Sequence, residues 1–164
     1  MKDITPGLYR TTRPLPGHEE QMPAQVLVFV GHTKEGKPFV VRPGKNVKNR
    51  WFWGDPVLPL DNESKESWAE SLRRLPREGF YTLPETLEFE SGGRWPQNAI
   101  VQLGYDGTGR GILFVAEDRE AESRNILFFA TTGQRIEDSL LDRLVWAPIL
   151  PVPVPPPPSV GLLN

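Results

Sequence analysis

Four cations and two tryptophans stand together between residues 42 and 53, and they form the strongest candidate binding site in the sequence. The cations fall within nine residues that contain no acid, and the tryptophans follow directly. In proteins that bind single-stranded nucleic acid, cations hold the phosphates and aromatic rings stack on the bases. The same pattern also fits a solvated basic loop followed by core tryptophans that share one face of a strand. The candidate partner-binding residues here are Arg42, Lys45, Lys48, Arg50, Trp51 and Trp53.

Carboxylates and histidines offer few catalytic arrangements. Glu88 and Glu90 share one face of a predicted strand close to Glu85, as a paired acid and base would require. Glutamates that alternate with apolar residues are, however, what any half-exposed strand presents. His18 and His32 lie in predicted loops, and no serine nucleophile motif accompanies them. We therefore expect a protein that is not an enzyme and assign no catalytic residue. A small hydrolase-like enzyme is the third hypothesis for its function.

Neither a cofactor nor a metal site is predicted. The run GYDGTGRG at residues 104–111 lacks the Lys-Ser/Thr pair of a phosphate-binding loop and has predicted strands on both sides, so it fits a hairpin turn. The sequence has no cysteine, which excludes disulfides, thiol nucleophiles and cysteine-bound zinc. With only two histidines, a histidine-rich metal site is not expected.

The composition indicates a folded protein of short strands and turns. Of the 164 residues, 18 are proline and 15 are glycine, and this share disfavours long helices. Lys and Arg outnumber Asp and Glu in the segment 1–76, whereas acids outnumber cations in the segment 77–164, so the halves have opposite net charges. Neither excess demands a nucleic acid or an anionic membrane as partner. Because no secretory signal or membrane-spanning run is visible, we expect a cytoplasmic protein without membrane contact.

Two segments, Gln25 to Val41 and Asn98 to Val115, have the same hairpin pattern. Each consists of two apolar runs joined by a polar turn that contains glycine, which is typical of a β-hairpin. The glycines of the first segment recur in the second at one constant shift in residue number, Gly31 as Gly104 and Gly36 as Gly109. At a shift smaller by one, the predicted helices also match, with Trp68, Leu72 and Pro76 recurring as Leu140, Leu144 and Pro148. The sequence therefore predicts a tandem duplication.

We predict a mainly β protein of two small barrel-like units, residues 1–76 and 77–148, followed by an extended proline-rich tail at 149–164. Each unit is expected to contain four to five strands and one short helix, the first of which would begin after Asn62 or Ser64. The layout resembles a tandem of SH3-like small barrels. This resemblance concerns the order of elements alone, because no family motif accompanies it.

The two units differ most in the segment after each hairpin, which is basic at residues 42–50 and acidic at 116–124. These complementary loops could join the two halves or two copies of the chain, so a homo-oligomer is one expected association. The tail could present a polyproline helix to a partner, with Pro155 and Pro156 as candidate binding residues. We predict a non-catalytic protein-binding module, that is, an adaptor, an immunity-type protein or an assembly factor. Nucleic-acid binding through the basic loop and its tryptophans is the alternative.

Overall fold

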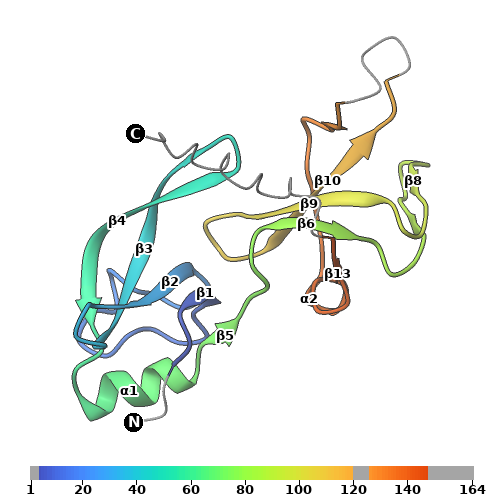
Figure 1. Ribbon diagram of the computed structural model, residues 1–164. Coiled ribbons are helices and arrows are strands. Elements are labelled where there is room, and N and C mark those ends of the chain that lie inside the picture. Colours follow the sequence, from blue (N-terminus) through green and yellow to red (C-terminus); the bar gives the residue numbers. More distant parts are fainter. Residues whose placement is uncertain (1–3, 120–125, 148–164) are drawn as a thin grey trace, which may run out of the picture.

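The computed structural model describes residues 4–119 and 126–147, and within them the protein is mainly β with two short helices (Figure 1). This confirms the predicted class of secondary structure. Two larger antiparallel sheets follow each other along the chain, and a separate pair of short strands is formed by β7 (Leu87–Glu88) and β8 (Arg94–Trp95). In these ranges no helix has the length and apolar character needed to cross a membrane.

The first sheet has five strands in the order β4-β3-β2-β1-β5, all antiparallel. Helix α1 (Glu63–Glu70) follows β4 along the chain and precedes the short edge strand β5. The strands of this sheet are β1 (Gly7–Arg10), β2 (Leu27–His32), β3 (Pro38–Val47), β4 (Arg50–Pro59) and β5 (Arg73–Arg74).

Helix α1 is capped at its N-terminus by Asn62, which is one of the two predicted caps. The Asn62 side chain accepts a hydrogen bond from the Lys65 N–H at 3.0 Å, and so satisfies a donor that the helix leaves unpaired. Trp68 is a residue of this helix and is fully buried. Its indole N–H donates to the Arg13 carbonyl at 2.8 Å. The helix thus closes the first core, whose buried residues also include Val28, Val30, Val40, Leu58 and Leu60.

The second sheet has the order β11-β10-β9-β6-β13, and β12 pairs with β10 as well. All of its pairings are antiparallel. Helix α2 (Asp138–Leu141) stands between β12 and β13 along the chain, in the place that α1 takes in the first half. The strands are β6 (Gly79–Thr82), β9 (Ile100–Tyr105), β10 (Gly111–Glu117), β11 (Phe128–Phe129), β12 (Gln134–Arg135) and β13 (Val145–Trp146).

Strand pairings in the second sheet follow those in the first at the shifts seen in the sequence. Gly7 pairs with Val30, and their counterparts Gly79 and Leu103 pair in the same way. The outer strands also correspond. In the first sheet the long strand β4 pairs with β3, and in the second sheet two short strands, β11 and β12, pair with β10 in its place. In both sheets the chain therefore passes through its strands in the same order.

Local backbone features also recur at these shifts. Gln25 and Asn98, which precede β2 and β9, both have positive φ angles, 57° and 65°. The Tyr9 hydroxyl donates to the Thr5 carbonyl at 2.7 Å, and the Tyr81 hydroxyl donates to the Arg77 carbonyl at 2.7 Å. Such features depend on the local chain path, so the two halves resemble each other in detail as well as in strand order.

Strand β2 contributes to two cores at once. Val28 and Val30 belong to the first core, whereas Leu27 on the opposite face is buried in the second core together with Leu75. The Leu27 N–H also donates to the Gly107 carbonyl, in the turn between β9 and β10, at 2.9 Å. The two apolar faces predicted for this strand are therefore both covered, one of them by the second half of the chain.

Candidate binding surface

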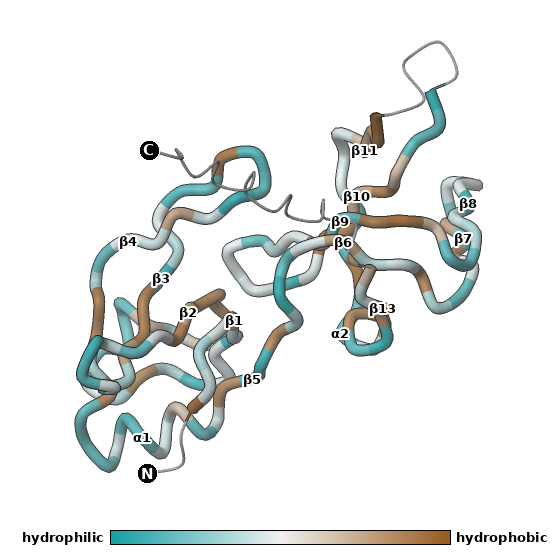
Figure 2. Tube along the Cα trace, viewed as in Figure 1, coloured by the Kyte–Doolittle hydropathy of each residue, from teal (hydrophilic) through white to brown (hydrophobic). Residues whose placement is uncertain are grey.

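The basic segment is a continuous hairpin, so the predicted loop at 42–50 is wrong. Strand β3 runs on to Val47 and β4 starts at Arg50, which leaves a turn of only Lys48 and Asn49. Both turn residues have positive φ, 51° and 62°, as two-residue hairpin turns require. Figure 2 shows the far end of this hairpin as mainly hydrophilic, with hydrophobic residues concentrated where β3 and β4 join the sheet. Residues 42–53 are called the basic hairpin below.

Trp51 and Trp53 lie on the face of the basic hairpin that packs against the second half of the protein. Both are in contact with the second core, and the Trp51 indole N–H donates to the Tyr105 carbonyl of β9 at 3.0 Å. The Trp53 ring also packs on Phe29, with centroids 5.4 Å apart. The two predicted binding tryptophans are thus partly buried and are held by contacts within the protein.

The opposite face of the basic hairpin is exposed and combines cations with apolar side chains. Lys45 is directly opposite Phe52, and Val47 is opposite Arg50, so all four side chains share one face. Phe52 is 53% exposed and Val47 40% exposed, and the Arg50 guanidinium lies 5.8 Å from the Phe52 ring centre. Among the residues that the structure describes, neither cation forms an ion pair. We call this set, Lys45, Val47, Arg50 and Phe52, the hairpin face.

The remaining predicted partner residues are placed elsewhere. Arg42 is half-buried, and its Nη1 donates to the Gln21 carbonyl at 3.0 Å, so it braces the loop before β2. Lys48 is exposed in the turn. Pro155 and Pro156, with the whole predicted tail, lie outside the described residues, as does most of the acidic segment 116–124.

The two halves of the chain form ion pairs with each other, and these lie outside the segments 42–50 and 116–124 that were predicted to be complementary. The Arg10 guanidinium donates two hydrogen bonds to the Asp138 carboxylate of α2, and Arg73 donates to both oxygens of Asp142 at 2.9 Å. Arg73 also lies 3.5 Å from Asp138. The hydrogen bonds from Arg10, with the nearby cations, hold the pKa of Asp138 below its ordinary value. We call these four residues the ion-pair cluster; the sequence offered no signal for its individual contacts.

Two of the acidic residues considered for catalysis lie beside arginines. Glu85 accepts a hydrogen bond from Arg143 at 2.7 Å, which lowers the pKa of the Glu85 carboxyl, and Glu88 lies 3.9 Å from Arg94. His18 contacts Gln21 at 3.0 Å, and His32 is exposed at the end of β2. In the described ranges no group of three or more His, Cys, Asp or Glu side chains is arranged to hold a metal ion.

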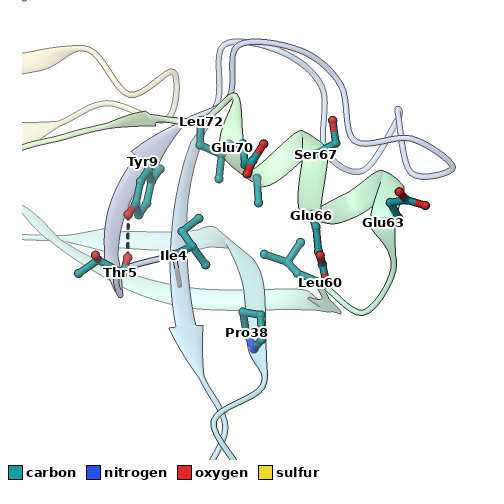
Figure 3. Close-up of a pocket in the computed structure, with 11 residues that line it drawn as sticks. Ile4, Thr5, Tyr9, Pro38, Leu60, Glu63, Glu66, Ser67, Glu70 and Leu72 are labelled. Carbon is teal, nitrogen blue, oxygen red and sulfur yellow. Dashed lines mark hydrogen bonds between the residues drawn. The ribbon is translucent and has the colours of Figure 1, made fainter. Parts of the chain in front are cut away.

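A pocket of about 680 Å³ lies between α1 and the start of the first sheet (Figure 3). Its lining includes the apolar residues Ile4, Leu60 and Leu72, whereas the helix contributes carboxylates. Glu66 extends from the helix towards Leu60 (Figure 3). No sequence pattern marks this pocket, because its two sides come from opposite ends of the first half of the chain. The lining carboxylates are Glu63, Glu66 and Glu70.

Comparison with known proteins finds no matching family model, no matching curated protein and no matching solved structure.

Proposed function

We propose that the protein is a non-catalytic protein-binding module, of the adaptor, immunity or assembly-factor kind, built from two SH3-like units in tandem. The matching strand registers and the two equivalent helices support the duplication. A meander of four strands, a short helix and a final edge strand against β1 is the order expected of an SH3-like unit, and the first sheet has this order. Cytoplasmic localisation stays a prediction.

One observation carries the proposal, namely the hairpin face. Aromatic residues, phenylalanine included, and arginine are enriched at protein interfaces relative to the rest of the protein surface. Here Phe52 and Arg50 are held on a hairpin whose other face is anchored by Trp51, so little ordering cost would accompany binding. The cations Lys45 and Arg50 favour an acidic surface on the partner protein.

The experiment compares two double variants with the same change in charge. Lys45→Glu with Arg50→Glu alters the hairpin face, whereas Lys34→Glu with Lys37→Glu alters exposed residues of the β2–β3 turn. Each variant and the wild type are coupled to a resin, and partners from native lysate are measured by quantitative mass spectrometry. We expect a set of acidic proteins that the control retains and the hairpin variant loses by tenfold or more. Equal capture by both variants would refute the proposal.

Nucleic acid is the second candidate ligand of the same face, because cations there flank an exposed aromatic ring. Fluorescence anisotropy with labelled single-stranded DNA and RNA at low salt separates the two ligands. Affinity that falls steeply with salt and disappears in the hairpin variant would favour nucleic acid. If protein binding is the function, neither probe should bind. Docking of the polyproline tail and self-association through the acidic segment stay predictions, since their residues lie largely outside the described ranges.

A further inference from the structure

The ion-pair cluster shows how a helix carboxylate is used at the junction of the two halves. Asp138 and Asp142 stand one turn apart on and just after α2, and they receive the guanidinium groups of Arg10 and Arg73. The Arg10 side chain is only 10% exposed, and its stem packs on Gly109 in the turn between β9 and β10. The two aspartates at α2 therefore bind arginine side chains, and both arginines come from the first half of the chain.

The equivalent positions in the first half are Glu66 and Glu70 of α1, at the shift that relates the two helices. The landmark for this alignment is the core residue two positions after the first acid, Trp68 in α1 and Leu140 in α2, which are both buried. Edge strands that follow the helices also agree, since Tyr9 pairs with Arg74 as Tyr81 pairs with Trp146. Acidic residues thus occur at matching sequence positions in both halves, as two glutamates on α1 and as two aspartates on and just after α2.

The surroundings of the two pairs differ. Whereas Asp138 and Asp142 are occupied by arginines, Glu66 and Glu70 line the open pocket, and no cation within residues 4–119 and 126–147 forms an ion pair with either. Glu70 is also the last residue of α1, where a negative charge opposes the helix dipole, and the last turn has no basic residue to offset it. Its carboxylate is therefore placed where it weakens the helix yet borders the pocket.

We propose that this pocket, called the α1 pocket below, binds an arginine side chain presented by a partner protein. The guanidinium would lie between Glu66 and Glu70, as Arg73 lies between Asp138 and Asp142. The apolar lining residues Ile4 and Leu72, which are partly exposed, would contact an aliphatic residue next to that arginine. The inference extends the proposed protein-binding function to a second surface, and it does not depend on the hairpin face.

The test is an NMR titration of the isotope-labelled full chain with a short peptide, acetyl-Ala-Leu-Arg-Leu-Ala-amide. A second peptide carries citrulline, which has nearly the same shape without the charge, in place of arginine. We expect amide shifts in α1 and at Ile4 and Thr5 with the arginine peptide, and affinity at least fivefold lower for citrulline. Glu66→Gln with Glu70→Gln should weaken the arginine peptide by tenfold or more. The control, Glu20→Gln with Glu90→Gln, removes two exposed carboxylates elsewhere and should leave the affinity unchanged.

Several results would overturn the proposal. Among them are the absence of shifts in α1 at millimolar peptide, equal affinity for the citrulline peptide, and unchanged affinity in the Glu66→Gln, Glu70→Gln variant with its fold intact by the same spectra. Binding that appears only after residues 1–3 are removed would assign the pocket to the chain's own preceding segment instead. The Lys45→Glu, Arg50→Glu variant should bind the peptide as the wild type does, so failure at the α1 pocket and failure at the hairpin face can be told apart.

Discussion

Replacing Asp138 by asparagine should destabilise the protein by about 2 kcal/mol, because the change removes the centre of the ion-pair cluster. Exposed ion pairs contribute roughly 0–1 kcal/mol, whereas breaking a fully buried pair costs roughly 3–5 kcal/mol. This pair lies between these cases, since the Arg10 side chain is 10% exposed and the Asp138 side chain 41% exposed. Water can therefore replace part of what the carboxylate provides, but the guanidinium of Arg10 stays nearly buried. For a chain of this size the loss corresponds to a fall in Tm of about 4–8 °C.

The matched control is Glu66→Gln, which makes the same chemical change at the equivalent position of α1, where no cationic partner is present among the described residues. Its cost should stay within about 0.5 kcal/mol. Both variants are measured by urea unfolding followed by tryptophan fluorescence, together with Arg10→Met and the double variant Arg10→Met, Asp138→Asn. We expect a coupling energy between Arg10 and Asp138 of about 1–2 kcal/mol. Equal costs for Asp138→Asn and Glu66→Gln, with no coupling to Arg10, would refute the role assigned to the cluster.

The same pair predicts how stability depends on pH. Arg10 lowers the pKa of Asp138 in the folded protein relative to about 3.9 in the unfolded chain. A carboxylate with a depressed pKa stabilises the fold above the unfolded value, and this contribution disappears as the pH falls through the folded value. The stability difference between wild type and Asp138→Asn should therefore be constant from about pH 5 to 7 and shrink below about pH 4. A difference that stays constant down to about pH 3 would exclude this origin.

Two further pairs of substitutions test how the halves are joined. Gly109→Ala and Gly36→Ala both place a side chain at positive φ, 74° and 79°, but only a Cβ on Gly109 would meet Arg10 atoms, at 3.1–3.2 Å. Gly109→Ala should consequently cost about 1–2 kcal/mol more in urea unfolding than its counterpart, and equal costs would contradict the packing described. Trp51→Phe removes the indole hydrogen bond to β9 and should lower the free energy of unfolding by about 1 kcal/mol. Phe52→Leu on the exposed face should change it by no more than about 0.5 kcal/mol. A larger loss for Phe52→Leu than for Trp51→Phe would contradict the assignment of Trp51 to the packed face of the basic hairpin.

Much of the local structure could be predicted from the sequence, because it depends on near neighbours. The apolar runs joined by glycine-containing turns located the β2–β3 and β9–β10 hairpins, and Asn62 with Trp68 located α1. The basic segment, which contains Pro43 and Gly44, was expected to be a loop. In the structure the register shifts at these residues and the hairpin continues beyond them. A Cβ on Gly44 would lie 3.3 Å from the Gly54 backbone, so glycine at this position lets the two strands approach closely.

The contacts that define the candidate sites depend on residues far apart in the chain, and for this reason they could not be predicted. Trp51 was identified as a candidate binding residue from its neighbours, yet its position is fixed by the carbonyl of Tyr105 in the second half. The attraction between the halves was anticipated from their net charges, but the arginines that mediate it belong to β1 and β5, outside the segment with the strongest charge. Charge totals indicate that two parts attract each other, and only the fold determines which residues meet.

The arrangement of the ion-pair cluster also limits how copies of this chain could associate. If two copies repeated the internal junction, the second half of one copy would have to offer arginines to α1 of the next. The residues equivalent to Arg10 and Arg73 are Thr82 and Val145, at the shift that relates the two helices, and neither carries a charge. The second half therefore has no arginine at these two positions, although α1 has both carboxylates. A head-to-tail repeat of this junction is consequently disfavoured, and the unused carboxylates of α1 are better matched to an arginine from a different protein.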